Sequence, residues 1–367
     1  MSNKLVASLS CVFKLAVKLL NSEFLCISMQ PITIKEALKL DAIYVDTRSP
    51  AEFEKDHIPN SLNIPIFDNK ERAEIGTIYK QNQDKAYEVG FGLYEGKLSD
   101  LKKQLNELDK DTKIVVYCWR GGLRSKTISE LTEKLGYDVN QLEGGYKSYR
   151  AYIREWYENY KLPFKFILLQ GLAGCGKTDL LKALHKQKVP IIDLEGLARH
   201  RSSLFGAIGL EPREQKAFET ALYTKINELS NEKFVLIEGE AHKVGKIFVP
   251  NLIFSEMEKS IKIKVNCSIE NRSKRIVKDY FSHGEDDKIK EIIKTLKKYF
   301  SNENYELMLK CLDEKNYYEV SRILLEDYYD PRYGRIVDEL EYDHTTDNDD
   351  FENCVSELVK FYKDLLN

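Results

Sequence analysis

Residues 165–178, KFILLQGLAGCGKT, decide how the second half of the chain folds. The apolar run from Lys165 to Gln170 is typical of a strand that is buried on both faces of a sheet. It leads directly into GLAGCGKT, which satisfies the pattern G-x-x-x-x-G-K-[ST] between a strand and a helix. Because backbone N–H groups in such a loop surround a di- or triphosphate, the stretch predicts a phosphate-binding site in an α/β domain.

The residues of this loop have separate expected roles. Lys177 would neutralise the terminal phosphates, and Thr178 would hold Mg²⁺ if a metal takes part. Cys175 is expected to be a small spacer and not a second nucleophile. The full set of expected phosphate-binding residues is Gly171, Gly174, Cys175, Gly176, Lys177 and Thr178.

A companion strand is expected over residues 234–240, FVLIEGE, and it ends in acid. The acid is Glu238, whereas the strand that accompanies such a loop usually ends in an aspartate, so ATP hydrolysis is a weaker expectation than phosphate binding. Glu238 is a candidate acid of the site. The alternative is that Glu238 and Glu240 cap a helix or form a solvated pair.

Two basic stretches could contact phosphate groups. Arg199, His200 and Arg201 lie side by side after a strand expected over residues 189–194, at the sheet edge where α/β proteins bind ligands. The run NRSKRIVKDYF, residues 271–281, places aromatic residues beside arginines, as RNA-binding surfaces do. The alternatives are a solvated basic turn for the first stretch and an exposed helix face for the second.

The first half of the chain also alternates strands and helices. Strands are expected over residues 42–46, 61–66 and 113–118, and this alternation predicts a parallel sheet covered on both sides. Residues 68–98 are expected to form helix and loop. An aromatic helix over residues 146–162 is ended by Pro163, where we place the domain boundary.

A second candidate site lies at CWRGGLRS, residues 118–125. A buried strand ends at Cys118, two glycines follow, and a helix begins near Ser125, so backbone N–H groups and a helix N-terminus face the sulfur. Two arginines add positive charge, which favours the thiolate. The same cradle would stabilise a persulfide or perselenide on that sulfur. Cys118 is therefore the candidate nucleophile, and its anion loop comprises Trp119, Arg120, Gly121, Gly122, Leu123, Arg124 and Ser125.

Composition excludes several classes of protein. The 367 residues carry a formal charge of −3, so the chain is not a bulk polycation, although residues 336–367 form an acidic tail. No apolar run approaches the ~18 residues that span a bilayer. The seven cysteines include no CxxC pair and no metal-binding spacing, which favours a reducing cytoplasm over a disulfide framework. We expect a cytoplasmic protein with no membrane partner, no metal site and no tightly bound cofactor.

Three segments together resemble a rhodanese domain over about residues 30–150. They are VDTRSPAEFEKDHIPNSLNIPI at 45–66, YCWRGGLRS at 117–125 and LEGGYKSYR at 142–150. The resemblance implies that Cys118 carries a chalcogen as a covalent intermediate. Asp46 and Arg48 match an Asp-x-Arg element of that family, either as catalytic residues or as a salt bridge that braces the loop.

The second half adds HRSSLFG at 200–206 and IEGEAHKVG at 237–245. With these segments the chain resembles the tRNA 2-selenouridine synthase family over about residues 30–367. The resemblance implies that selenium replaces sulfur at the 2-thiouridine wobble base of tRNA, through a geranylated intermediate made from geranyl diphosphate. Selenophosphate would supply the selenium, with a selenophosphate-supplying enzyme as a further partner. Ala241 departs from the family, which usually has a serine there.

These features give an expected organisation and two rival functions. Residues 1–28 are expected to be an extension, not necessarily native, before a start at Met29. A rhodanese-like domain (29–150), a linker helix (151–163) and a P-loop NTPase-like α/β domain with a helical, acidic C-terminal region (164–367) would follow. One rival is an ATP-coupled sulfurtransferase with another acceptor, and the other is a nucleotide-sensing redox regulator.

Overall fold

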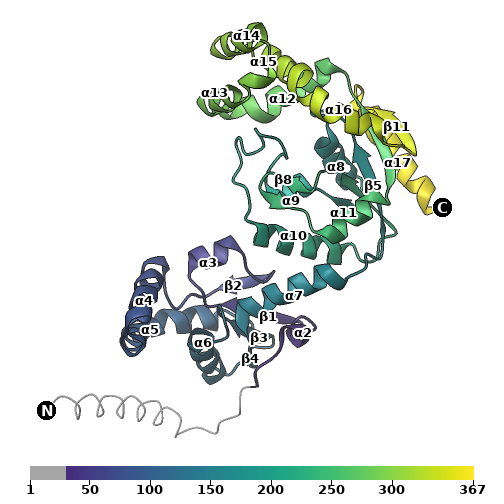
Figure 1. The fold of residues 1–367 in the computed structure, drawn as a ribbon. Coiled ribbons are helices and arrows are strands. Elements are labelled where there is room, and N and C mark those ends of the chain that lie inside the picture. The colour runs from purple at the N-terminus through teal and green to yellow at the C-terminus, as the bar shows by residue number, and fades with distance from the viewer. Residues whose placement is uncertain (1–29) are drawn as a thin grey trace, which may run out of the picture. The chain divides into compact units, whose positions relative to one another are not determined.

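The computed structural model describes residues 30–367, which divide after Tyr152 into two units (Figure 1). The expected extension over residues 1–28 and the start at Met29 lie outside the described residues. Each unit has a sheet in which every strand pairing is parallel. Helices connect the strands in both units, so the predicted α/β class is confirmed.

The first unit contains a four-stranded sheet in the order β2-β1-β3-β4. Its strands are β1 (Ala42–Asp46), β2 (Ser61–Asn63), β3 (Lys113–Tyr117) and β4 (Val139–Gln141). Its helices are α2 (Ile34–Ala37), α3 (Pro50–Lys55), α4 (Asn69–Gln81), α5 (Gln83–Asn106) and α6 (Leu123–Lys134). The β-branched strand β3 has neighbours on both sides and is fully buried from Ile114 onward. It therefore delivers Cys118 to the carboxyl edge of the sheet.

Residues 68–98 differ from the expected mixture of helix and loop, because α4 and the start of α5 occupy nearly all of them. Asp68 and Glu71 form a reciprocal capping box at the start of α4, with two N–H···O distances of 2.8 Å. Asn82 then caps α5. Gly90 lies inside α5, where an added Cβ would come within 3.3 Å of the Phe67 ring. Close packing, and not a turn, accounts for this glycine.

Helix α7 (Gly145–Asn159) connects the two units. It ends before Pro163, and its last turns pack within the second unit: the Trp156 ring stacks on Tyr160 at 4.1 Å and meets Tyr223 edge-on at 4.9 Å. The Tyr157 hydroxyl donates to the backbone carbonyl of Glu219. The division at Tyr152 thus precedes the boundary expected at Pro163, because aromatic packing assigns this end of the helix to the second core.

The second unit contains a five-stranded sheet in the order β11-β10-β5-β7-β6. Its strands are β5 (Lys165–Gln170), β6 (Ile191–Ile192), β7 (Phe234–Glu238), β10 (Ile261–Asn266) and β11 (His344–Asp347), with a separate antiparallel pair β8 (Lys243–Val244) and β9 (Ile247–Phe248). β5 is central, so its carboxyl end and the following α8 (Lys177–Lys186) lie in the middle of the edge. β11 was not expected from the sequence.

Helices cover this sheet and extend beyond it (Figure 1). Those of the sheet region are α9 (Leu194–Ala198), α10 (Gln215–Glu228), α11 (Asn251–Glu258), α12 (Ile269–Tyr280) and α17 (Phe351–Leu366). The helical region comprises α13 (Asp286–Thr295), α14 (Asn302–Asp313), α15 (Tyr317–Ile323), the π-helical η3 (Leu324–Tyr329) and α16 (Asp330–Glu339). It has its own apolar core around Ile289 and Met308. Across residues 30–367, no helix has the length and apolar character needed to cross a membrane.

Candidate functional sites: a thiolate loop and a phosphate loop

Cys118 follows β3 directly and lies at the base of the turn into α6. The residue is only 3% exposed, whereas Gly122 is exposed and Leu123 is 57% exposed, so the loop beside the sulfur faces solvent. The Gly122 N–H donates to Sγ at 3.2 Å, and the Ser125 hydroxyl lies 3.3 Å from Sγ. Helix α6 begins at Leu123, two residues earlier than expected, which brings its N-terminus closer to the thiol.

The electrostatics of the loop favour the thiolate. Burial alone raises the pKa of the Cys118 thiol, but the Ser125 hydroxyl, the charge of Arg124 and backbone N–H groups more than compensate, so the pKa is lowered. Arg124 is held by an ion pair with Glu52 at 3.3 Å. The sulfur is therefore prepared to act as a nucleophile and lies among donors that suit an anion.

The LEGGYKS segment, residues 142–148, forms the floor of this loop. The Tyr146 N–H donates to the Cys118 carbonyl at 2.8 Å, and the Lys147 N–H donates to the Trp119 carbonyl at 3.0 Å. The Trp119 ring packs 5.4 Å from the Tyr146 ring. Gly145 has φ 57°, and an added Cβ would meet the Cys118 carbonyl oxygen. Only glycine fits at this close approach.

Gln141 is a site residue that sequence reasoning missed. Its Nε2 lies within hydrogen-bond distance of three acceptors and can donate its two hydrogens among them: the carbonyl oxygens of Gly121 and Gly122, at 2.9 and 3.2 Å, and the Ser125 hydroxyl oxygen at 2.8 Å. This amide at the end of β4 thereby holds the loop backbone in place and orients the hydroxyl that contacts the sulfur. Its position just before LEGGYKS was the one available signal.

Asp46 and Arg48 brace the loop from within the fold. Both are at most 1% exposed, and the guanidinium binds the carboxylate through Nε and Nη2 at 2.9 and 2.6 Å. Arg48 also donates to the Asp56 carbonyl and lies 4.0 Å from the centre of the Tyr146 ring. Of the two roles considered for this pair, the salt bridge matches these contacts, because neither side chain reaches solvent.

The phosphate loop connects β5 to α8, as its sequence predicts. Gly174 and Gly176 have φ of 75° and 90°, and an added Cβ at Gly176 would lie 2.6 Å from the Asn348 amide nitrogen. Lys177 Nζ donates to the Gly171 carbonyl at 3.0 Å, so the ammonium closes the loop opening. Cys175 is fully buried among the apolar side chains beside the sheet. This position suits the spacer expected from the sequence.

Two arginines of α12 support the loop from outside. Arg272 is 3% exposed, donates to the Ala173 carbonyl at 2.8 Å and pairs with Asp330. Arg275 donates to the carbonyls of Cys175 and Asn348, at 3.4 and 2.9 Å. These two arginines of the basic run 271–281 are therefore structural partners of the loop backbone.

Buried carboxyl groups surround Thr178. Its hydroxyl lies 3.0 Å from carboxylate oxygens of both Glu195 and Glu238, and Glu238 also accepts the backbone N–H of Glu195 at 2.8 Å. A hydroxyl has one hydrogen, so the second contact requires a proton on one carboxyl group. Burial and the charge of Glu195 raise the pKa of Glu238 well above its usual range, and burial and the charge of Glu240 raise that of Glu195 to about 8.

The surroundings of Glu238 exclude only part of its alternative role, because its carboxylate accepts the N–H of Glu195 in the first turn of α9, as a helix cap does. Glu238 is fully buried, so the solvated-pair alternative for this residue is wrong. Glu240 instead accepts a hydrogen bond from Ser202. Glu195 was missed by sequence reasoning, because its contact with Thr178 arises only when α9 packs beside the loop. In the described part of the chain, no group of three or more His, Cys, Asp or Glu residues could hold a metal ion.

The cluster Arg199–His200–Arg201 divides in the structure. Arg199 ends α9 with φ 53° and is exposed. Arg201 donates to the Ile208 carbonyl at 2.8 Å and lies 5.5 Å from the centre of the Tyr280 ring, so it braces its own loop. His200 is half-buried, and its pKa is lowered by burial and by Arg201. The geometry leaves Arg199 best placed of the three to meet a ligand.

Comparisons with known proteins cover both units. A family model described as the tRNA 2-selenouridine synthase AAA domain matches residues 164–364, more than half of the chain, and a rhodanese-like domain model matches residues 32–152. The chain belongs to the tRNA 2-selenouridine synthase family. The two matches fall on the two sites described above, one on the thiolate loop and the other on the phosphate loop.

Three relatives named tRNA 2-selenouridine synthase illustrate the likeness. The chain is 33% identical to the Shewanella piezotolerans protein over 67% of this chain and 68% of the relative. It is 30% identical to the Shewanella woodyi protein over 79% of this chain and 86% of the relative. It is 32% identical to the Shewanella pealeana protein over 64% of this chain and 65% of the relative, so that alignment spans slightly less than two thirds of the relative.

Proposed function

We propose that this chain is a tRNA-modifying enzyme that replaces sulfur by selenium at the 2-thiouridine wobble base, using geranyl diphosphate and selenophosphate. Membership of the synthase family supports the acceptor and the overall exchange. One observation carries the proposal: this chain has both a loop that stabilises a thiolate and a phosphate loop with Lys177 at its opening. The thiolate loop suits an anionic selenium donor, and the phosphate loop suits a diphosphate leaving group.

The first step is assigned to the phosphate loop. The 2-thio sulfur attacks C1 of geranyl diphosphate, the C–O bond breaks, diphosphate departs with the electron pair, and N3 of the base loses its proton. Lys177 and the backbone N–H groups stabilise the charge that develops on the leaving diphosphate. If Mg²⁺ binds, the Thr178 hydroxyl and the Glu238 and Glu195 carboxylates are oxygen donors of the kind it prefers, and it would supply further charge neutralisation.

The second step is assigned to the Cys118 loop. Selenium forms a bond to C2 of the base, the C–S bond breaks, and the geranylated sulfur leaves as a thiol. Water takes the phosphoryl group of selenophosphate, which leaves as phosphate, and N3 regains a proton. The exchange is redox-neutral. Gly122 N–H, the Ser125 hydroxyl and Arg124 would bind the anionic donor beside the thiol. Because tRNA and reduced thiols occur together in the cytoplasm, we expect the reaction there, with a selenophosphate-forming reaction upstream.

The proposal is tested by reconstitution with tRNA that carries 2-thiouridine. Geranyl diphosphate alone should give S-geranyl-2-thiouridine, and addition of selenophosphate should give 2-selenouridine with release of geranylthiol and phosphate. Lys177→Ala removes a charge-assisted contact worth about 1.5–3 kcal/mol, so geranyl diphosphate should bind about 10–100-fold more weakly. Lys165→Ala, which removes the same charge from an exposed side chain at the start of β5, is the matched control and should bind normally.

Other results would contradict the proposal. ATP turnover without tRNA, together with sulfur transfer to a different acceptor, would favour an ATP-coupled sulfurtransferase. Unchanged binding of geranyl diphosphate by the Lys177→Ala variant would overturn the assignment of the phosphate loop. Nucleotide binding that changes only the oxidation of Cys118, with no modification of tRNA, would favour a redox regulator.

A further inference from the structure

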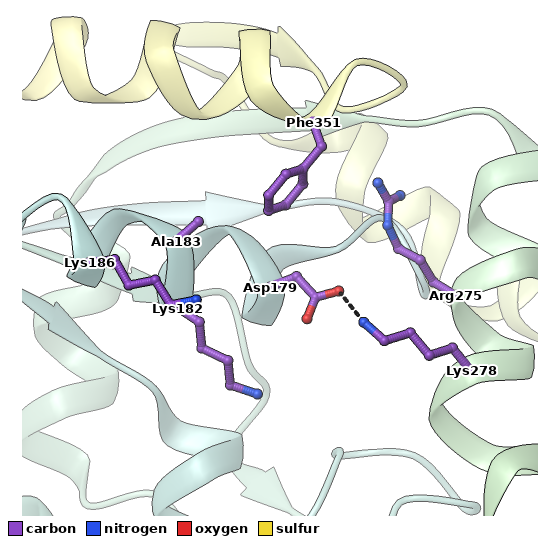
Figure 2. Close-up of a pocket in the computed structure, with 7 residues that line it drawn as sticks. All are labelled: Asp179, Lys182, Ala183, Lys186, Arg275, Lys278 and Phe351. Carbon is purple, nitrogen blue, oxygen red and sulfur yellow. Dashed lines mark ion pairs between the residues drawn. The ribbon is translucent and has the colours of Figure 1, made fainter.

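A hollow of about 480 Å³ lies on the second unit beside the phosphate loop (Figure 2). Helix α8 forms one side and α12 the other, and the first residue of α17 lies above them. The lining residues are Asp179, Lys182, Ala183, Lys186, Arg275, Lys278 and Phe351. Neither the proposed geranylation step nor the selenium step uses this hollow.

The charge of the hollow is strongly positive. It contains four cationic side chains and one carboxylate. Asp179 pairs with Lys278 at 3.8 Å, but Lys278 is 72% exposed, so this ion pair is weak. Lys182 and Lys186 are exposed and lie four residues apart on one face of α8, and within residues 30–367 neither lies in ion-pair contact with a carboxylate, although the charge of Lys182 acts on Asp279 of α12. An anionic partner would therefore gain at least two contacts without displacing an existing pair.

The hollow is adjacent to the phosphate loop. Asp179 immediately follows Thr178, and Arg275 donates to the carbonyl of Cys175 inside the loop. The guanidinium is fixed there by its second bond to the Asn348 carbonyl. A ligand that fills the hollow would consequently lie next to any diphosphate held by Lys177.

Phe351 supplies an aromatic surface at this position. Its side chain extends from the start of α17 toward α8, into the space that the lysines border (Figure 2). Cationic side chains around an aromatic ring are the combination by which proteins hold a nucleic-acid strand, since phosphates pair with the cations while a base stacks on the ring.

We propose that this hollow binds the sugar–phosphate backbone of tRNA next to the nucleotide that is modified, with a neighbouring base stacked on Phe351. The inference rests on the proposed function, because it takes tRNA as the substrate. It adds a location for the RNA strand: two backbone phosphates lie against Lys182 and Lys186, beside the loop that holds the geranyl donor.

The experiment compares tRNA binding by Lys182→Ala/Lys186→Ala with a matched control. The control is Lys290→Ala/Lys294→Ala on α13, which has the same spacing and removes the same charge, but each of its lysines is already paired with a carboxylate. Each lost phosphate contact lowers the slope of log K against log salt by about 0.7–0.9. We expect the slope to fall by about 1.4–1.8 in the α8 variant and tRNA to bind about tenfold more weakly. The control should match the wild type.

A second variant tests stacking. Phe351→Ala removes the aromatic ring and should weaken tRNA binding about 5–100-fold, whereas Phe351→Tyr keeps a ring and should bind tRNA as the wild type does. Neither variant changes the charge of the protein. Geranyl diphosphate binding and Cys118 alkylation should be unaffected in all these variants, which also shows that they are folded.

The outcomes separate this inference from the proposed function. Equal slopes for the α8 variant and the control would overturn the docking site, even if the wild-type protein forms 2-selenouridine. Weaker binding of geranyl diphosphate or of ATP, with tRNA binding unchanged, would assign the hollow to a small molecule and also overturn it. A lower slope in a protein that forms no 2-selenouridine would uphold the docking site and refute the proposed reaction.

Discussion

Ser125→Ala is the substitution that most sharply tests why Cys118 is reactive. The Ser125 hydroxyl lies 3.3 Å from the sulfur, and it is the largest of the contributions that lower the pKa of the thiol against the effect of burial. Removing it leaves the backbone donor and Arg124 in place. The pKa of Cys118 should therefore rise, while the loop keeps its shape.

The size of the effect follows from the contacts. A hydrogen bond to a charged group contributes about 1.5–3 kcal/mol, which corresponds to about 1–2 pKa units at about 1.4 kcal/mol per unit. The Ser125 hydroxyl also lies 3.1 Å from the Gly122 carbonyl and can donate to only one acceptor at a time. We therefore expect the lower end, a rise of about one pKa unit.

The expected kinetics differ on the two sides of the pKa. Well below both pKa values the thiolate fraction falls about tenfold, but a thiolate of higher pKa is intrinsically about threefold more nucleophilic. Alkylation of Cys118 in the Ser125→Ala variant should thus be about three- to fourfold slower than in the wild type at pH values below both pKa values. Above both pKa values it should be about threefold faster, so the two pH profiles cross.

The assay is alkylation by iodoacetamide as a function of pH, with the Cys118 peptide followed by mass spectrometry. Ser129→Ala is the matched control, because Ser129 lies one turn further along α6, is buried, and its hydroxyl has no hydrogen-bond partner among the described residues. Its profile should coincide with that of the wild type. A Ser125→Ala profile that also coincides would refute this explanation of the reactivity.

Three further predictions concern single residues. Gly145 and Gly136 both have positive φ, but only at Gly145 would an added Cβ lie within contact distance of backbone atoms. Gly145→Ala should therefore lower the free energy of unfolding, measured in urea, by about 1–3 kcal/mol more than Gly136→Ala does. Burial raises the pKa of Cys267 to about 11, so at pH 8 Cys118 should be alkylated well before Cys267; the reverse order would be inconsistent with both pKa directions. Gly176→Ala should reduce geranyl diphosphate binding, measured by calorimetry, because its Cβ would lie 2.6 Å from a side-chain amide nitrogen that supports the loop.

The parts of the fold that could be predicted are those with local signals. The strand at residues 42–46 and the strand before the phosphate loop are short apolar runs, and both coincide with strands of the structure. β11 was missed because HTTD has no apolar run. It is an edge strand whose backbone pairs with β10 only after the helical region has brought it back to the sheet.

Among the site residues, too, only those with a local sequence signal could be predicted. Cys118 and Lys177 could be identified from short motifs, because each motif contains the turn that shapes its own loop. Glu195 and Gln141 could not, since their contacts with Thr178 and Ser125 join segments 17 and 16 residues apart. A single sequence records no such pairing. The role of Arg275 behind the phosphate loop was hidden for the same reason.

The central claim is that the two loops carry out successive steps on one nucleotide, and nucleoside mass spectrometry of tRNA treated with the Cys118→Ser variant tests it most directly. With 2-thiouridine tRNA, geranyl diphosphate and selenophosphate all present, S-geranyl-2-thiouridine should accumulate and 2-selenouridine should form much more slowly than with the wild type. Formation of 2-selenouridine at the wild-type rate, or failure to form the geranylated base, would contradict the account.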